Sequence, residues 1–358
     1  MRILILKFRN IGDVLLATPL IHNLKAQYPD AEIDFSLNKG TESILTLNPK
    51  INNLIIYDRE YIKSLPIFKK IWNELRFIKA HKMKEYDLVI NLTNGDRGNL
   101  ISWIVGANVR VGYSNKRWFF RNFFTHKLPR QDLRHTVEVN LDPLRVLDIP
   151  IKRKSVEIFW SKRDEKIIKN ELKNIKEFIH IHAVSRWIFK CISDISMAQI
   201  IDYCEIQLGI KTVISSSDNN YELKKVDSIL SHVDSSPINL AGKLSLKQVA
   251  ALNKRAKLFI GVDTAIMHIS ASNNTPTLAF FGPSGADHWG PWDNNLLKSS
   301  YTKRNGVQSM GMHRVFSESR SCQPCGNDGC NGTKISDCLM QMDINKIKKI
   351  ILEMQNVK

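Results

Sequence analysis

Residues 257–292 read KLFIGVDTAIMHISASNNTPTLAFFGPSGADHWGPW, and this stretch decides the fold. Leu258 to Ile260 is a short apolar run typical of a strand buried on both faces. Asp263 and Thr264 follow it, and they are residue types that open a helix, here over 265–272. The first turn of that helix would point free backbone N–H groups, together with the Thr264 hydroxyl, at the carboxyl end of the strand. Such an arrangement predicts a phosphate site, and a diphosphate is the expected ligand.

The second half of the stretch again has a buried strand followed by a tight turn. Residues 277–281 form the next apolar run, and Gly282-Pro283-Ser284-Gly285 gives a second tight turn on the same edge of the sheet. Outward from here, apolar runs and helical patterns alternate along the whole chain, which is typical of βαβ units. Strands are expected at 3–6, 32–37, 53–57, 86–92, 109–112, 156–160, 178–182, 211–214 and 237–240, and helices at 14–28, 63–84, 137–147, 161–173, 195–208, 221–230, 246–254 and 344–354.

The 358 residues are too many for one ordinary core, so two domains are expected. Ile149-Pro150 and the charged run Lys152-Arg153-Lys154 interrupt the pattern and indicate the linker. We therefore predict an α/β chain of two doubly wound, Rossmann-like domains, 1–155 and 156–340, facing an interdomain cleft. Residues 341–358 would form a closing helix that packs back on the first domain.

Composition limits the class of protein. Hydrophobic residues make up 43% and charged residues 24% of the chain, which is ordinary for a globular protein. No apolar run approaches the roughly 18 residues of a spanning helix, and Lys7 and Arg9 interrupt the start before a signal-peptide core could form. A cytoplasmic protein is expected. The formal net charge of +17 implies acidic partners.

The positive charge is concentrated between residues 106 and 135. Seven basic residues stand there against one acid, Asp132, with aromatic residues among them. Such a surface suits anionic lipid headgroups or single-stranded nucleic acid, and the alternative is a partly buried aromatic cluster with a solvated basic rim. The basic residues are Arg110, Lys116, Arg117, Arg121, Lys127, Arg130 and Arg134, and the aromatic ones are Trp118, Phe119, Phe120, Phe123 and Phe124. The helix expected over 63–84 reads as amphipathic, with Ile67, Ile71, Leu75 and Ile78 at helical spacing. Its basic residues would then form the solvent-exposed face, and they are Lys69, Lys70, Arg76, Lys79 and Lys82.

Asp13 is the candidate general base. It follows Gly12 in the first strand-to-helix turn, Lys7-Phe8-Arg9-Asn10-Ile11-Gly12-Asp13, where a carboxylate would point into the cleft and could take a proton from an attacking hydroxyl. A helix N-cap explains the residue as well. The chain has neither a G-x-G-x-x-G turn nor a P-loop, so a usual NAD turn and a P-loop ATPase are not supported.

Four segments in order resemble the bacterial ADP-heptose:lipopolysaccharide heptosyltransferases, glycosyltransferase family 9. They are MRILILKFRNIGDVLLATPLIHNLKAQYPDAEID at the start, HAVSRWIFKCI at 182–192, LAGKLSLKQVAAL at 240–252 and FIGVDTAIMHISASNNTPTLAFFGPS at 259–284. The pair SRWIFKC and KFRNIGDVLLATP is most similar to the subtype that adds a side heptose to the inner core, heptosyltransferase III. The resemblance implies an inverting, metal-independent transferase of GT-B fold, with ADP-heptose in the C-terminal domain and a lipid A–core acceptor in the N-terminal domain.

The resemblance also implies roles for single residues. Asp13 matches the family's proposed base, and Lys190 matches a lysine on the donor diphosphate, where an ammonium would neutralise the leaving ADP; an ordinary surface lysine is the alternative. Asp263, Thr264 and Ala265 match the phosphate-binding turn, in which we expect the Asp263 carboxylate to cap the helix because it would repel a diphosphate. Ser185 and Arg186 are further phosphate candidates, and His268 is either a donor contact or a packed core histidine.

The nucleoside and the acceptor complete the expected site. Lys243, Leu244 and Ser245 match the loop that reads adenine, and Glu222 is our choice for the ribose, with Asn220 or Asp218 as alternatives because this segment departs from the family pattern. Six residues of the first domain are assigned to the acceptor: Arg9, Asn10, Gly12, Lys116, Arg117 and Arg121. We expect a monomer bound peripherally to the anionic inner face of the inner membrane, with no nucleic acid partner. The alternatives are a heptosyltransferase of another core position, an enzyme using another nucleotide-sugar, and a non-catalytic binder of anionic glycolipid or nucleic acid.

Four cysteines stand close together near the end of the chain. Cys322, Cys325, Cys330 and Cys338 include one pair with the spacing of a zinc knuckle, but the inner spacings match no common finger. A structural zinc and free or partly oxidised thiols both remain open, and no cofactor is expected.

Overall fold

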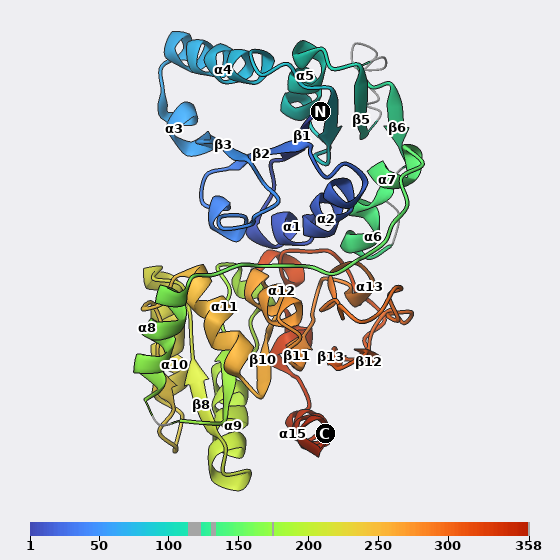
Figure 1. Cartoon of the computed structure of the whole chain (residues 1–358). Coiled ribbons are helices and arrows are strands. Elements are labelled where there is room, and N and C mark those ends of the chain that lie inside the picture. The colour runs from blue at the N-terminus through green and yellow to red at the C-terminus, as the bar shows by residue number, and fades with distance from the viewer. Residues whose placement is uncertain (114–122, 130–133, 174, 357–358) are drawn as a thin grey trace. The chain divides into compact units, whose positions relative to one another are not determined.

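The computed structural model describes residues 1–113, 123–129, 134–173 and 175–356. The chain divides into two units, Met1–Phe159 and Trp160–Lys358 (Figure 1). Each unit contains one largely parallel sheet covered by helices, so the predicted doubly wound fold class is confirmed.

The N-terminal unit contains a six-stranded sheet in the order β3-β2-β1-β4-β5-β6, and all of its pairings are parallel. The central strands are buried on both faces, which explains their continuous apolar runs. The strands are β1 Arg2–Lys7, β2 Glu32–Asn38, β3 Asn53–Tyr57, β4 Leu88–Asn91, β5 Val109–Tyr113 and β6 His126–Leu128.

The helices of this unit differ from the sequence pattern in two places. The single helix expected over 14–28 is two helices, because Pro19, which lacks an N–H, lies in the first turn of the second one. The helix expected over 137–147 is also two. The helices are α1 Ile11–Leu15, α2 Thr18–Gln27, α3 Arg59–Ser64, α4 Ile67–Lys82, α5 Asp96–Val105, α6 Thr136–Asn140 and α7 Asp142–Val146, with a short η1 at Glu42–Ile44.

The C-terminal unit contains a seven-stranded sheet in the order β12-β13-β11-β10-β7-β8-β9. Only the edge strand β12 is antiparallel, to β13. The expected strand over 156–160 is not formed. The strands are β7 Phe178–His182, β8 Lys211–Ile214, β9 Ile238–Asn239, β10 Leu258–Val262, β11 Thr277–Phe280, β12 Val307–Met310 and β13 His313–Phe316.

The helices of the C-terminal unit pack on both faces of this sheet. They are α8 Lys162–Leu172, α9 Asp194–Asp202 with a π-helical turn η4 at Tyr203–Gln207, α10 Asn220–Leu230, α11 Leu246–Arg255, α12 Ala265–Ser272, α13 Ala286–Trp289, α14 Asp337–Met340 and α15 Ile344–Asn356, with short η3 at Ile188–Lys190 and η5 at Cys330–Gly332. The apolar side of α15, with Ile347, Ile351 and Met354, belongs to the core of this same unit, next to α9. The buried side of the closing helix is therefore occupied within the C-terminal unit, and its expected contact with the first domain stays a prediction.

Both sheets have the same topology. If the parallel strands of each unit are numbered in chain order, both read 3-2-1-4-5-6. In such sheets the order of the strands reverses between strands 1 and 4, and ligands bind outside the carboxyl ends of those two strands. The candidate edges are thus the ends of β1 and β4 in one unit and of β7 and β10 in the other. Of the helices in the described part of the chain, none combines the length and apolar character that crossing a bilayer demands.

Candidate functional site

Lys190 and Asp263 meet at the switch point of the C-terminal sheet. Lys190 ends η3, in the loop after β7, and Asp263 directly follows β10. The Lys190 ammonium and the Asp263 carboxylate lie 2.6 Å apart. Two residues 73 positions apart in the sequence therefore form an ion pair where a doubly wound fold binds its ligand.

The Asp263 carboxylate is held from a second side. The Ser284 hydroxyl, in the turn after β11, donates a hydrogen bond to it at 2.5 Å. Burial alone would raise the pKa of Asp263, but the Lys190 charge and hydrogen bond, the Ser284 bond and His268 outweigh it, so its pKa is lowered. The carboxylate is thus ionised and does not cap the helix; the N-cap of α12 is Thr264. Our expectation of a capping role for Asp263 is wrong.

Thr264 and Ala265 begin α12 at the same edge. The Thr264 backbone is extended, and its hydroxyl is buried without a hydrogen-bond partner among the described residues. The first backbone N–H groups of a helix have no partner within the helix, so they and this hydroxyl form an anion-binding set. His268 lies one turn further on, 4% exposed, with its ring 6.4 Å from that of Trp289.

Ser185 and Arg186 lie in the loop between β7 and η3. The Ser185 hydroxyl is buried and accepts a hydrogen bond from the Trp187 backbone N–H at 3.1 Å, which tightens the loop before Lys190. Arg186 is exposed, and its guanidinium stacks over the Trp187 ring at 4.9 Å.

The two predicted nucleoside segments are neighbours. Gly242 has a φ of +70°, and a Cβ there would lie 2.9 Å from the Leu223 side chain, so the loop after β9 closes against the start of α10. Glu222 is buried, and its carboxylate accepts a hydrogen bond from the Ser217 backbone N–H at 2.9 Å.

Hydrogen bonds of Lys243 and Ser245 hold the rest of the predicted adenine loop in place. The Lys243 ammonium donates to the Asn239 carbonyl at 3.0 Å, Leu244 is half-buried, and Ser245 is the N-cap of α11.

In the N-terminal unit, Asp13 lies after β1 at the edge where β1 and β4 end. Asp13 is half-buried in the first turn of α1, and its carboxylate accepts a hydrogen bond from the Asn10 backbone N–H at 3.3 Å. The N-cap is Asn10, not Asp13, and the two form a capping box. Arg9 and Asn10 are exposed and Gly12 is half-buried in the same turn.

Lys7 is a residue that the sequence analysis missed at this edge. It ends β1 and is 4% exposed, and its ammonium donates to the Asn140 side chain at 2.9 Å and to the Leu92 carbonyl at 3.4 Å. Burial lowers the pKa of Lys7 to about 8, with the Asp13 charge acting in the opposite direction and Arg9 in the same one. A lysine closing a buried apolar strand was the signal that could have identified it.

The basic stretch over 106–135 is described in part. Lys116, Arg117 and Arg121 lie outside the described residues. Arg110 donates to the Phe123 carbonyl at 2.8 Å, and Arg134 forms a two-point ion pair with Asp142. Phe124 is buried, and Phe123 stacks on Trp103 at 5.1 Å. The described residues of this stretch therefore fit the alternative of a packed aromatic cluster.

The four C-terminal cysteines have unlike surroundings. Cys322 and Cys325 are exposed, whereas Cys338 is buried, and burial raises its pKa to about 11. Within the described ranges no three His, Cys, Asp or Glu side chains converge as metal ligands do.

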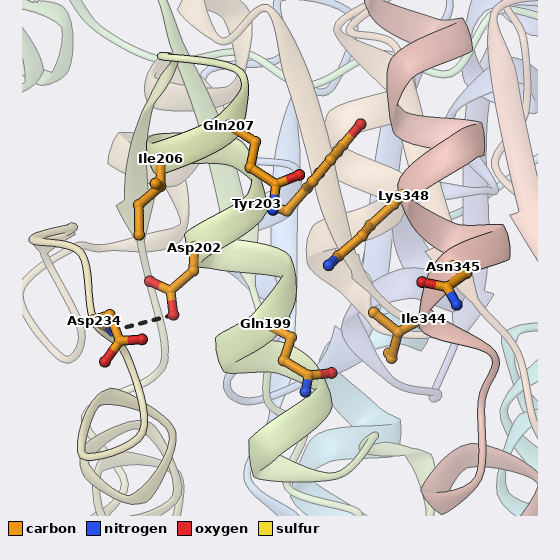
Figure 2. Close-up of a pocket in the computed structure, with 9 residues that line it drawn as sticks. All are labelled: Gln199, Asp202, Tyr203, Ile206, Gln207, Asp234, Ile344, Asn345 and Lys348. Atoms are coloured by element: carbon orange, nitrogen blue, oxygen red, sulfur yellow. Dashed lines mark hydrogen bonds between the residues drawn. The ribbon is translucent and has the colours of Figure 1, made fainter.

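A cavity of about 490 Å³ lies elsewhere in the C-terminal unit, between the end of α9, the loop at Asp234 and the start of α15 (Figure 2). The π-helical turn that borders it leads into β8, so the cavity is at the amino-terminal edge of the sheet, opposite the switch point. It contains none of the predicted site residues, and we do not assign the donor to it. It is lined by Gln199, Asp202, Tyr203, Ile206, Gln207, Asp234, Ile344, Asn345 and Lys348.

The family model and several known proteins that this chain resembles name glycosyltransferases or heptosyltransferases. The sequence pattern of "glycosyltransferase family 9 (heptosyltransferase)" matches residues 74–316. The chain is similar to lipopolysaccharide heptosyltransferase 3 of Escherichia coli, with 33% identity over 80% of this chain and 85% of the relative. It is also similar to the lipopolysaccharide core heptosyltransferase OpsX of Haemophilus influenzae, with 24% identity over 86% of each chain.

Two solved structures have the same fold. A glycosyltransferase of family 9 from Veillonella parvula superposes with a TM-score of 0.79 and 21% identity, covering 99% of this chain and 97% of the other. The Escherichia coli heptosyltransferase WaaC, solved with ADP, superposes with a TM-score of 0.72 and 18% identity, covering 99% of this chain and 100% of the other.

Proposed function

This chain belongs to glycosyltransferase family 9, and on that premise we propose that it transfers L-glycero-D-manno-heptose from ADP-heptose to a heptose of the lipopolysaccharide inner core. The chain is a glycosyltransferase of GT-B fold. The similarity to heptosyltransferase 3 over most of the chain supports the subtype, and the Lys190–Asp263 pair beside the start of α12 is the observation that carries the donor site.

The donor diphosphate is proposed to bind at the start of α12. Backbone N–H groups there and the unpartnered Thr264 hydroxyl supply hydrogen bonds to phosphate oxygens. Lys190 supplies the positive charge, and its ion pair with Asp263 holds the ammonium at this edge. The charge that develops on the leaving ADP is then stabilised by a preorganised cation.

We propose the other donor and acceptor contacts at the residues that the sequence analysis assigned to them. Lys243 and Leu244 would contact the adenine, and Glu222 the ribose, with Asn220 or Asp218 as the alternatives. Two further donor contacts, Ser185 and Arg186, would reach phosphate. The acceptor would lie near Arg9, Asn10 and Gly12 in the N-terminal unit, together with Lys116, Arg117 and Arg121.

The proposed reaction is one displacement. Asp13 accepts the proton of the acceptor hydroxyl, whose oxygen forms the new bond to the anomeric carbon. The bond from that carbon to the diphosphate oxygen breaks, and its electron pair leaves with ADP. Attack from the face opposite ADP inverts the configuration.

Replacement of the base tests this mechanism. Asp13→Asn should lower kcat about 10²- to 10⁴-fold with little change in KM for ADP-heptose, because the amide cannot accept the proton. The readout is ADP release with a heptose-containing core acceptor. Asp30→Asn, an exposed acid of the same unit, is the matched control and should retain the wild-type rate. A wild-type kcat in Asp13→Asn would refute the assignment.

The Lys190→Met variant tests the donor site. It should lower kcat about 10²-fold or more, since it removes a group that stabilises the leaving diphosphate, and it should weaken ADP binding measured by calorimetry. Lys176→Met, at an exposed lysine of the same unit, should change neither quantity. Unchanged ADP affinity and rate in Lys190→Met would exclude a contact with the diphosphate.

The acceptor subtype and the location are proposed separately. We propose that the enzyme works as a monomer at the cytoplasmic face of the inner membrane, where a lipid A–core acceptor would lie. Mass spectrometry of the core oligosaccharide from cells lacking the protein should show the loss of one side heptose. Loss of everything beyond the first heptose would instead indicate another core position.

A further inference from the structure

The outer face of helix α4 exposes large apolar side chains to solvent. Five residues of its first three turns contribute, and their exposed fractions are high for their type. They are Ile67 at 61%, Phe68 at 83%, Ile71 at 49%, Trp72 at 69% and Leu75 at 56%. The sequence pattern had indicated Ile67, Ile71 and Leu75 as part of the apolar stripe of an amphipathic helix, yet of that stripe only Ile78 is buried. Contiguous exposed apolar surface of this kind marks an interaction site.

The opposite side of α4 already fixes the helix to its unit. Glu74 accepts a hydrogen bond from the Tyr57 hydroxyl at 2.5 Å and pairs with Arg97 at 2.9 Å. Phe77 packs edge-on against Tyr57, and the buried His81 ring is 3.0 Å from the Ser36 hydroxyl. Figure 1 shows α4 next to α5 along the N-terminal unit. The outer apolar residues are therefore not needed to hold the helix in place.

The cations of α4 lie around the same outer face. Phe68, Trp72, Leu75 and Lys79 follow at intervals of four, three and four residues, which places them on one stripe. Lys69 and Arg76 flank this stripe and Lys82 extends it, and all three are exposed. None of these four cations makes an ion pair within the described part of the chain, and the one acid of α4, Glu74, points inward.

We propose that this outer face of α4 docks onto an anionic lipid bilayer, with the apolar residues entering the interface and the four cations contacting lipid phosphates. An exposed apolar stripe bordered by Lys and Arg is the chemistry of an interfacial helix. The inference deepens the proposed function and rests on it, since an acceptor anchored by lipid A lies in such a surface. This contact lies outside the stretch 106–135 for which a membrane contact was expected, and Arg110, Arg134 and Phe124 of that stretch are engaged within the unit.

A second copy of the chain fits this face less well. A symmetric dimer would bring the same surface of two protomers together, with Lys69, Arg76, Lys79 and Lys82 of each facing the same cations of the other. Like charges held face to face oppose such an association. An anionic bilayer instead neutralises them, so charge complementarity selects the membrane.

The apolar contribution is tested with vesicles and no sugar substrate. The full chain should co-sediment with vesicles containing about 30% phosphatidylglycerol in phosphatidylethanolamine, and far less with phosphatidylcholine vesicles. Phe68→Ser with Trp72→Ser should lower the partition coefficient about tenfold or more. The matched control is Leu297→Ser with Ile206→Ser, at residues 66% and 62% exposed in the C-terminal unit, and it should bind as the wild type does.

The contribution of the α4 cations is tested by replacing two lysines three residues apart, with a lysine pair of the same spacing on another helix as the control. Lys79→Gln with Lys82→Gln should lower binding roughly tenfold and weaken its dependence on salt. Lys166→Gln with Lys169→Gln, two exposed lysines three residues apart on α8, should leave binding unchanged. A blue shift of tryptophan fluorescence on vesicle binding should disappear in Trp72→Phe, which still binds.

The possible results separate this proposal from the proposed function. Equal vesicle binding by wild type and both α4 double variants overturns the docking proposal, as does a wild-type dimer that the Phe68 and Trp72 variant abolishes in sedimentation velocity. Transfer to a deacylated, water-soluble core acceptor should be unchanged in all α4 variants. Failure of that transfer in the wild-type chain would refute the proposed function while leaving the vesicle result intact.

Discussion

At the scale of single residues, the Lys190–Asp263 pair also stabilises the fold. Asp263→Asn should lower the free energy of unfolding by roughly 1–3 kcal/mol, because Lys190 loses its partner in a site where its side chain is only 25% exposed. Urea denaturation at pH 7 is the measurement. Asp328→Asn breaks a pair whose side chains are 60% and 63% exposed and should change little. Equal losses of unfolding free energy from the two substitutions would mean that the buried pair stabilises the fold no more than the exposed one.

The same residues show where sequence reasoning ends. Asp263 at the end of a buried strand was predictable, because β10 and α12 follow directly from the local pattern. Its partner was not, since the loop that carries Lys190 lies 73 residues away and only the strand order brings it there. Local rules therefore assigned the Asp263 carboxylate to the nearest helix, whereas the tertiary fold gives it a cation. Lys7 was missed for the same reason, as its partners Asn140 and Leu92 are distant in sequence.

At the scale of elements, Glu222 joins β8 to α10. Glu222→Ala should lower the free energy of unfolding by about 1–2 kcal/mol, because the Ser217 backbone N–H loses its acceptor, while Glu222→Gln, which retains an acceptor oxygen, should cost less. Donor KM should rise with the loss of stability in Glu222→Ala. If KM rose while stability stayed at the wild-type value, Glu222 would act on the ribose directly and not through the loop.

Elements with two buried faces were the easiest to predict. β1 and β10 have continuous apolar runs, and β7 is buried throughout although it contains His180 and His182; the ends of all three strands lie within two residues of the expected ones. α4 was predicted as a helix, but its apolar pattern did not identify the buried side, because Glu74 and His81 face inward and Phe68 and Trp72 face outward. The pattern also gave no signal for the edge strand β12, where buried and exposed residues alternate over four positions.

At the scale of the whole molecule, the doubly wound class of both units was predictable from the alternation of strands and helices, whereas the strand order that the two sheets share was not. In the N-terminal unit Lys7 and Asp13 lie at the carboxyl end of the first strand, and in the C-terminal unit Lys190 follows the first strand and Asp263 the fourth.

Acid should destabilise the C-terminal unit through its buried histidines. Burial lowers the pKa of His180 to about 3 and that of His182 and His313 to about 4, from the ordinary histidine value of 6.5. Between those values the unfolded chain binds protons that the folded chain does not, so stability falls as pH decreases below 6.5. From pH 7.5 to 5.5 the loss should be about 1 kcal/mol for each group.

Urea denaturation from pH 8 to 5 measures this slope. His180 is the most informative position because the residue is fully buried and both of its ring nitrogens are engaged, one with Asn253 and the other with Ser215 at 2.7 Å. His180→Asn should be less stable at pH 7.5 but should show a shallower decline towards pH 5.5, whereas His232→Asn, at an exposed histidine, should retain the wild-type slope. A wild-type midpoint that stays constant between pH 7.5 and 5.5 would contradict neutral buried histidines. Hydrogen exchange of β7 and β8, corrected for the intrinsic pH dependence, should locate the loss in that sheet, since His180 and His182 lie on β7 and Ser215 follows β8.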